Sequence, residues 1–421
     1  MKNILTKASK LFTHNTVWII ASVFIGACAG VIGSIFHIVL EAVTEIRHLI
    51  PYLVCFLPLA GIAIAVFYIV VHQGNNKGTD DIMEAVKGGN QITWLFIPLI
   101  FVSTTLTHLF GGSAGREGAA LQIGGSLGSA IGKAAKLKPE HMRLAILCGM
   151  SSTFTALFGT PIAATVFTIE FISVGILHYS ALFPCLIGSL TALGVASLFG
   201  IAPTSFTLSV IPEATFTNLL LCIALAILCA IVSIIFCHVM HETSHLAKKI
   251  KSPFLRTFIG GLLIIVLTFA VGNYNYNGAG MDVIERAIAG EALPWAFFLK
   301  MIFTAITIGF GYKGGEIVPS FFIGATFGCV VGGLIGLPPS FAAALGLIGV
   351  FCGVTNAPIA SVFLAVELFG NQGFIFFAIT AFLCFLLSGH IGLYESQRHL
   401  FSKDGSHSDI KPSYSNEFYI K

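Results

Sequence analysis

The sequence predicts an all-α polytopic membrane protein built from two similar halves. Of its 421 residues, 56% are hydrophobic and only 10% are charged, whereas a soluble domain carries roughly 25% charged residues. Apolar runs of membrane-spanning length recur from Val17 to Gly392; there are about a dozen, too many for a single anchor. Long uninterrupted runs are typical of helices rather than of barrel strands. Gly and Pro interrupt several runs, which predicts short and broken helices.

The order of apolar and polar stretches defines the predicted domains. Residues 1–16 form a short basic lead, and its lysines favour a cytoplasmic N-terminus. The membrane domain is predicted at 17–394, and the polar tail at 395–421 is too small for a regulatory domain. The first half is predicted to contain spans at 17–43, 51–71 and 94–110, a polar stretch at 72–91, a glycine-rich element at 111–132, a basic loop at 133–143, and a run over 157–171 before a last span near Gly200.

The second half repeats the landmarks of the first in the same order. KGTDDIMEAVKGG recurs as GAGMDVIERAIAG, GREGAALQIGGSLG as GGEIVPSFFIGATFG, and GTPIAATVFTIEF as NAPIASVFLAVELF. The chain is therefore predicted to consist of halves at about 17–200 and 216–394. Repeats with broken helices are the architecture of secondary transporters, although similarity alone leaves open whether the halves are parallel or inverted. The matched pairs are Gly78 with Gly280, 202 residues apart, Gly115 with Gly315, 200 apart, and Glu170 with Glu367, 197 apart.

The glycine-rich element GGSAGREGAALQIGGSLGSAIG, at 111–132, is the predicted centre of the site. Glycines let the backbone approach a small ligand, and a helix starting after them would direct N–H groups and its positive dipole end at an anion. Arg116 and Glu117 lie among these glycines in an otherwise apolar stretch. Ionisable side chains at membrane depth are costly and usually functional. The alternative is that the glycines serve only close helix packing.

Four further residues are candidates for either a functional or a structural role. Glu316, in GGEIVP, is the second-half counterpart of the Arg116–Glu117 region, and either acts in the site or caps a helix. Glu170 and Glu367 close matching apolar runs, which favours a structural role such as hydrogen bonding to backbone at broken helix ends. Tyr394 ends the last span as an interfacial tyrosine or as a hydrogen-bond donor to an anion.

Two motifs point to other functions. The sequence HETSH at 241–245 fits HExxH, which places two histidines on one helical face for zinc. A third ligand is missing from the apolar runs, because Asp404 and Gly405 lie in the polar tail. GFGYKG at 309–314 fits GxGxxG but follows a membrane run rather than a strand. We therefore predict no metal, no cofactor and no enzyme, with an intramembrane zinc protease as a distant alternative.

Cysteines and charge exclude other classes. The ten cysteines nearly all lie within apolar runs and form no CxxC pair, so no disulfide framework is expected. The net charge is +3, and no basic patch interleaved with aromatic residues indicates a nucleic-acid partner.

Several of these motifs together resemble the CLC family of chloride channels and transporters. GREGA at 115–119 resembles the family's GREGP signature, GGEIVP at 314–319 its GxFxP element, and LFGTPIAATVFTIEF at 157–171 its internal-glutamate segment. Tyr394 matches the tyrosine that closes the ion site. The glutamate at position 316 is similar to that of the fluoride/proton antiporter branch, and Phe171 stands where chloride/proton exchangers carry a proton glutamate.

The resemblance implies an inverted-repeat bundle of broken, tilted helices, acting as a homodimer in the inner (plasma) membrane with one pore per subunit. Its substrates would be fluoride or chloride, together with protons, and a chloride channel or chloride/proton exchanger is the alternative. Glu117 would be the gating and proton-coupling glutamate, and Glu316 would lie on the proton or fluoride pathway. The implied anion-binding residues are Gly78, Thr79, Gly115, Arg116, Gly118, Ile317, Val318 and Tyr394.

Overall fold

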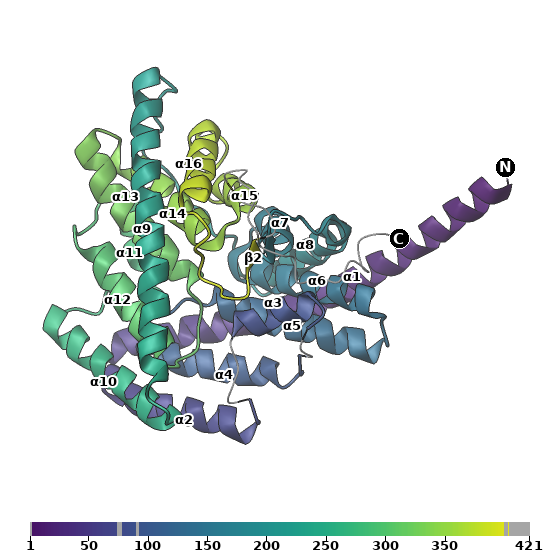
Figure 1. Cartoon of the computed structure of the whole chain (residues 1–421), viewed down its shortest axis with the longest axis horizontal. Helices are drawn as coiled ribbons and strands as arrows, with labels where there is room; N and C mark the ends of the chain where they lie inside the picture. Colours follow the sequence, from purple (N-terminus) through teal and green to yellow (C-terminus); the bar gives the residue numbers. More distant parts are fainter. Residues whose placement is uncertain (1, 74–77, 90–91, 400–402, 404–421) are drawn as a thin grey trace.

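A computed structural model describes residues 2–73, 78–89, 92–399 and 403, with backbone alone for 2–15 and 398–399. Most of the predicted tail therefore lies outside the described residues. Helices make up nearly all of the regular structure in these ranges, and the chain reverses direction many times (Figure 1). Two short strands, β1 (Ser173–Val174) and β2 (Arg398–His399), pair in parallel and join the segment before the last helix of the first half to the segment after Tyr394.

The helices fall into the two predicted halves, separated by an extended connection at 201–215. In Figure 1 the first half runs from purple to blue and the second from teal to yellow. The first half contains α1 (Lys2–Leu49), η1 (Pro51–Phe56), α2 (Leu57–Val70), α3 (Thr79–Val86), α4 (Phe96–Leu109), α5 (Glu117–Ala134), α6 (Pro139–Phe158), α7 (Pro161–Glu170), η2 (Tyr179–Ala181) and α8 (Leu182–Leu198). The second half contains α9 (Phe216–Lys248), α10 (Pro253–Val271), α11 (Met281–Ile288), α12 (Ala296–Gly309), α13 (Ile317–Ile335), α14 (Pro339–Thr355), α15 (Pro358–Phe369) and α16 (Phe374–Leu387).

The lengths of these helices fit the expected broken spans. Within the described ranges, six helices are long and apolar enough to cross a membrane, and six further apolar helices have only 10–17 residues. A full crossing needs about 20 residues, so the short helices end inside the bilayer. Backbone groups at such ends need partners from within the protein, and this requirement shapes the centre of the fold.

Helix ends differ from the sequence expectation at two places. Helix α1 extends through the basic lead, and α6 begins at Pro139, inside the predicted basic loop. Helix α9 continues to Lys248, so that the motif at 241–245 is helical throughout.

Glycines bring the paired helices of each half into close contact. A Cβ atom placed on Gly124 would lie 2.2 Å from the carbonyl oxygen of Gly149, and one on Gly324 would lie 2.2 Å from that of Gly346. Helix α5 thus packs against α6, and α13 against α14, at backbone distance. Small residues are what such close packing requires in a membrane. The same device at matched positions is evidence that the halves share one structure.

Contacts between the halves are reciprocal. Gly115 and Gly315 each donate a backbone hydrogen bond of 2.7 Å to the other, as an antiparallel bridge. The Glu170 carboxylate at the end of α7 accepts hydrogen bonds from the N–H groups of Ile359 (3.1 Å) and Ala360 (2.7 Å), at the start of α15. This exchange of equal contacts is what a two-fold relation between inverted halves produces.

The reverse contact completes the pair. The Glu367 carboxylate near the end of α15 accepts hydrogen bonds from the N–H groups of Ile162 (3.0 Å) and Ala163 (2.8 Å), at the start of α7. Each acidic side chain therefore caps the helix of the other half, where orphan N–H groups and the positive dipole end meet.

Removal of one of these carboxylates should destabilise the fold. Glu170→Ala leaves two N–H groups of α15 without a partner, and we expect a loss of about 1–3 kcal/mol in the free energy of unfolding. Glu170→Gln keeps one acceptor oxygen and should lose less. Thermal unfolding in detergent measures the order of the variants, with the exposed Glu285→Ala as control. Equal melting temperatures for Glu170→Ala and Glu285→Ala would contradict the capping role.

Candidate functional site

The site is organised around the starts of two helices from opposite halves. Helix α5 begins at Glu117 and helix α13 at Ile317, each two residues after one of the paired glycines Gly115 and Gly315. A Cβ atom on Gly315 would lie 2.5 Å from the Gly118 nitrogen, so any side chain there would separate the two helix starts. Both helices therefore direct their first N–H groups and positive dipole ends into one small region.

The Glu117 carboxylate occupies this region. Its Oε2 atom accepts hydrogen bonds from the backbone N–H of Arg116 (3.0 Å) and from that of Val318 (3.3 Å) at the start of α13. Its Oε1 atom is buried and makes no hydrogen bond within the described part of the chain. The side chain is wholly buried, and a charge in that position is costly unless it is compensated. Glu117 thus takes the place of an anion held by two helix starts.

Arg116 supplies positive charge at the same point. Its Nε atom lies 3.9 Å from Glu117 Oε1, and its guanidinium carbon lies 6.0 Å from the centre of the Phe158 ring. The side chain is only 12% exposed. A buried guanidinium beside an apolar wall raises the affinity of its surroundings for any negative charge, whether carboxylate or free anion.

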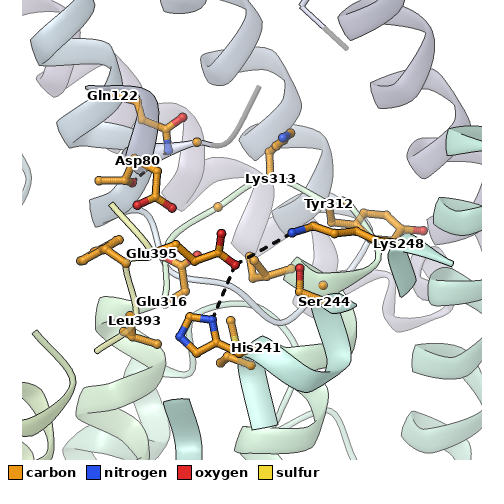
Figure 2. Close-up of a pocket in the computed structure, with 18 of the residues that line it drawn as sticks. Asp80, Gln122, His241, Ser244, Lys248, Tyr312, Lys313, Glu316, Leu393 and Glu395 are labelled. Atoms are coloured by element: carbon orange, nitrogen blue, oxygen red, sulfur yellow. Dashed lines mark hydrogen bonds and ion pairs between the residues drawn. The ribbon is translucent and has the colours of Figure 1, made fainter. Parts of the chain in front are cut away.

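A cavity of about 640 Å³ opens beside these helix starts (Figure 2). Its walls combine polar and apolar side chains and come from both halves and from the segment after α16. Four of the predicted residues line it: Gly78, Thr79, Glu316 and Tyr394. Its other polar side chains are Asp80, Gln122, His241, Ser244, Lys248, Arg256, Tyr312, Lys313 and Glu395.

Thr79 and Gln122 connect the cavity to the buried Glu117 region. The Gln122 Nε2 atom donates to Thr79 Oγ1 (3.3 Å) and to the Gly118 carbonyl oxygen (3.1 Å). A Cβ atom on Gly118 would lie 3.5 Å from Thr79 Oγ1. The cavity therefore ends within van der Waals distance of the α5 start, with a hydroxyl and an amide at its inner limit.

Tyr394 and Glu316 present polar groups to the same space. The Tyr394 hydroxyl is buried and makes no hydrogen bond to any described residue, and the ring packs edge-on against Phe171 at 5.7 Å between centres. Glu316 is the N-cap residue of α13, yet its side chain makes no capping hydrogen bond and instead lines the cavity. A buried donor without a partner and a carboxyl group facing a polar space are the groups that a small anion and a proton would use.

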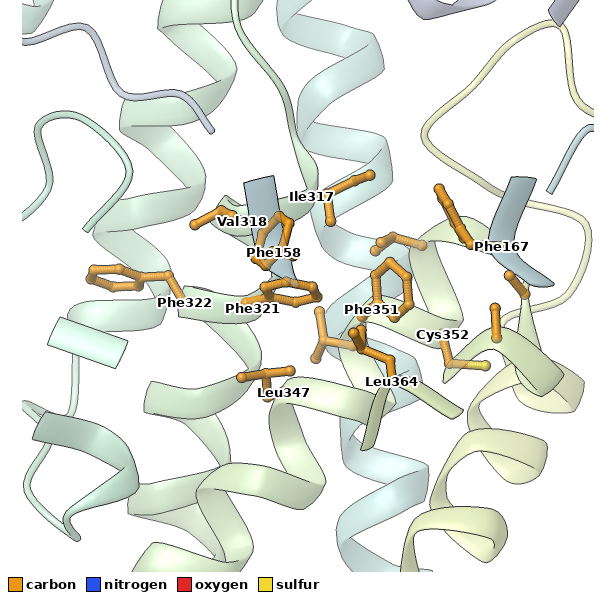
Figure 3. Close-up of a cluster of buried hydrophobic side chains, with 14 of the residues drawn as sticks. Phe158, Phe167, Ile317, Val318, Phe321, Phe322, Leu347, Phe351, Cys352 and Leu364 are labelled. Carbon is orange, nitrogen blue, oxygen red and sulfur yellow. The ribbon is translucent and has the colours of Figure 1, made fainter. Parts of the chain in front are cut away.

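The remaining predicted residues lie deeper than the cavity. Ile317 and Val318 are buried in an aromatic cluster (Figure 3), in which Phe321 packs edge-on against Phe158 (6.2 Å) and Phe351 (5.2 Å). Val318 contributes its backbone N–H rather than its side chain. The cluster keeps water from the helix starts, which strengthens electrostatic interactions there.

The sequence analysis placed the two groups of candidate residues in one anion site, and the structure separates them into a buried carboxylate site and an adjoining cavity. It also adds three residues that the sequence analysis did not select. Asp80, Gln122 and Lys313 all line the cavity. Gln122 could have been selected from the sequence, because it is an isolated amide side chain among the mostly small and apolar residues of α5. Lys313 could have been selected too, as a lysine inside the run GYKGG.

In the histidine motif at 241–245, the His241 ring contacts the backbone of the segment after α16. His241 Nε2 lies 2.8 Å from the Gly392 carbonyl oxygen. Across the described ranges, no group of three or more His, Cys, Asp or Glu side chains is arranged to hold a metal ion. Asp404 and Gly405, named above in the search for a third zinc ligand, lie outside those ranges.

Broken helices from two inverted halves, with helix starts that hold a carboxylate between them, define a membrane transport protein for small ions. Residues 60–389 match the family model described as voltage gated chloride channel, and the chain belongs to that family. The chain is 32% identical to a chloride/fluoride channel protein of Pseudomonas syringae pv. tomato, over 93% of this chain and 89% of that protein.

Solved structures and a further sequence relative also indicate this family. A crystal structure of a CLC-type fluoride/proton antiporter is similar with a TM-score of 0.88 and 30% sequence identity, over 92% of this chain and 99% of that chain. The H⁺/Cl⁻ exchange transporter ClcA of Vibrio cholerae is 24% identical, over 83% of this chain and 81% of that protein. A slow cyanobacterial Cl⁻/H⁺ antiporter, at 19% identity and a TM-score of 0.76, shares the fold. The expected family and fold are confirmed.

A methyl group at the glycine bridge should disrupt the site. Gly315→Ala pushes the starts of α5 and α13 apart, and we expect anion efflux from proteoliposomes to fall at least about tenfold because the helix dipoles then no longer converge. Gly194→Ala, on α8 where nothing lies within 4 Å, is the matched control. Efflux from Gly315→Ala equal to that of the control would show that the close approach is unnecessary.

Proposed function

We propose that the protein is a fluoride/proton antiporter that exports fluoride across the inner (plasma) membrane, driven by the inward proton gradient. The observation that carries the proposal is the Glu117 carboxylate, held between the backbone N–H groups of Arg116 and Val318. A carboxylate and a small anion need the same donors, so that they compete for one position. A carboxyl group that leaves when protonated makes anion binding and proton uptake parts of one cycle.

Fluoride is favoured over chloride by the polar groups at the cavity. Fluoride is small and strongly hydrated, so it needs more hydrogen-bond donors than chloride when it leaves water. The cavity offers the Tyr394 and Thr79 hydroxyls and, when it is protonated, the carboxyl of Glu316. The relative from Pseudomonas syringae carries fluoride in its name, and a similar solved structure is that of a fluoride/proton antiporter. A chloride channel or chloride/proton exchanger is the second candidate, supported by the similarity to ClcA.

Site roles follow from this proposal. Glu117 acts as gate and proton carrier, and Glu316 receives protons or interacts with fluoride on the cavity side. Gly78, Thr79, Gly115, Arg116, Gly118, Ile317, Val318 and Tyr394 surround the anion pathway. We also propose a homodimer in which each subunit has its own pathway. Glu170 and Glu367 have structural roles, and no step requires a metal or an organic cofactor.

Glu117→Gln should uncouple anion transport from proton transport. The amide has a similar shape but cannot bind and release a proton in the cycle, so we expect proton movement to fall at least about tenfold. A fluoride electrode and a pH electrode, read together on proteoliposomes, measure both fluxes. Glu140→Gln, an exposed carboxylate on α6, is the control. Normal proton exchange by Glu117→Gln would remove Glu117 from the gating role.

Glu316→Gln should slow fluoride turnover about tenfold while Glu117 is intact, because the cavity loses its titratable group next to the α13 start. Initial fluoride efflux measures this, with the exposed Glu213→Gln as control. Unchanged efflux would reduce Glu316 to a structural residue. Chloride efflux faster than fluoride efflux, without proton movement in the unmodified protein, would instead favour a passive chloride channel.

A further inference from the structure

His241, Lys248 and Glu395 form a polar group at the rim of the cavity, which we call the rim triad (Figure 2). The Glu395 Oε1 atom lies 3.9 Å from His241 Nδ1 and 4.0 Å from Lys248 Nζ, so one oxygen serves both nitrogen groups. His241 and Lys248 come from the last two turns of α9, and Glu395 follows Tyr394 directly. Neither the anion site nor the zinc interpretation accounts for this arrangement.

The hydrogen bond to Gly392 fixes which nitrogen of His241 binds a further proton. His241 Nε2 lies 2.8 Å from the Gly392 carbonyl oxygen, and a carbonyl oxygen only accepts. Nε2 therefore carries the hydrogen, and the lone pair of the neutral ring is on Nδ1, which faces Glu395. The imidazole is oriented to gain and lose a proton on the side of the carboxylate.

The exposure of the rim triad decreases toward the cavity. The side chains of Glu395 and Lys248 are 61% and 60% exposed, whereas that of His241 is 33% exposed. Lys248, Lys249 and Lys251 form a basic cluster after α9, and basic clusters indicate the cytoplasmic side. The triad thus connects the cytoplasmic solution with the cavity interior.

Besides Glu395, the acidic side chains that line the cavity are Asp80 and Glu316, and Glu316 is the one at the start of α13. Glu316 interacts electrostatically with Asp80 from α3, with Lys313, and with Glu117 from α5. Asp80 Oδ1 also accepts a hydrogen bond from the Ser396 N–H (2.7 Å), which holds the segment that carries Glu395 against α3. The other ionisable groups that line the space are Arg256 from α10, Tyr312 and Tyr394.

The wall behind Tyr394 offers no alternative route. Phe171 packs edge-on against the Tyr394 ring and stacks on Phe167 at 4.5 Å between ring centres. A phenyl ring has no atom that binds a proton. The cavity has enough polar groups and volume for water molecules to connect its ionisable side chains. At its rim, the triad adds an imidazole, which can both accept and donate a proton.

We propose that His241 and Glu395 form the proton-transfer pair between the cytoplasm and Glu316. This inference rests on the proposed fluoride/proton exchange. In the direction of fluoride export, Glu316 releases its proton to water in the cavity, and His241 Nδ1 accepts it. The resulting imidazolium passes the proton to Glu395 Oε1 and becomes neutral again. The Glu395 carboxyl then loses the proton to the solution, and Nε2–H stays bonded to Gly392 throughout. Lys248 competes with protonated His241 for the same oxygen and so favours release.

The test compares two pairs of variants. Each replaces a histidine or a glutamate by glutamine, which has a similar size, and only one pair lies at the cavity. His241→Gln and Glu395→Gln remove the proposed relay. His245→Gln and Glu242→Gln alter exposed residues of the same motif that do not line the cavity. Each protein, reconstituted at full length, is assayed for fluoride and proton fluxes together at bath pH 5 to 8. We expect both relay variants to slow both fluxes at least about fivefold at pH 7 and to flatten their pH profile, with the fluoride-to-proton ratio unchanged.

Each outcome has a distinct meaning. Wild-type rates and pH profiles in His241→Gln and Glu395→Gln would overturn the relay, and so would an equal effect of His245→Gln, which would indicate the HETSH motif as a unit. Glu395 is largely exposed, so its variant tests the relay even if His241→Gln fails to fold. Failure of the proposed function is distinguishable from these results, because the unmodified protein would then move fluoride without protons.

Discussion

The shared use of two helix starts by one carboxylate is the interaction on which the rest of the structure depends. Helices α5 and α13 begin at Glu117 and Ile317 in the protein interior, and their first N–H groups need partners that lipid cannot supply. The Glu117 carboxylate satisfies the Val318 N–H across the bridge between the halves. That contact exists only because Gly115 and Gly315 permit backbone approach. Broken helices, glycines and a buried acid are therefore one structural solution.

The same solution is used twice with different consequences. At α7 and α15, Glu170 and Glu367 also cap helix starts across the halves, and both of their oxygens accept hydrogen bonds. Glu117 differs, because its Oε1 atom has no hydrogen-bond partner among the described residues. A fully bonded carboxylate is a structural element, whereas the partly bonded one is the group that, in the proposed transport cycle, exchanges its position with an anion. Whether both carboxylate oxygens accept hydrogen bonds thus distinguishes Glu170 and Glu367 from Glu117.

The two sides of the paired helix starts differ in polarity. Phe158, Phe321 and Phe351 pack on one side of the α13 start. On the other side the cavity lies beside Glu316, the N-cap residue of α13, and reaches the α5 start through Thr79 and Gln122. In the proposed transport cycle, an ion that enters the cavity therefore meets the side chains of Thr79 and Gln122 before the helix starts. The aromatic cluster on the opposite side keeps the electrostatic interactions strong.

Much of this arrangement could be predicted from the sequence, because the repeated landmarks carried the information. The matched glycines and glutamates located the halves, the helix starts and Glu117. The position of Glu316, facing the cavity without a capping bond, required the structure, since a glutamate before a helix is compatible with either role. The contribution of His241 and Glu395 also required it, because they are about 150 residues apart in the chain and meet only through the path after α16.

Equilibrium binding of fluoride as a function of pH, by calorimetry or fluorine NMR on the purified protein, tests the central claim most directly. If Glu117 and fluoride compete for the same N–H groups, protonation of the carboxylate frees the site, and affinity in the unmodified protein rises as pH falls. Glu117→Gln should then bind fluoride more tightly at neutral pH, with little pH dependence. The same affinity and the same pH dependence in both proteins would show that carboxylate and anion occupy different positions, and would contradict the account.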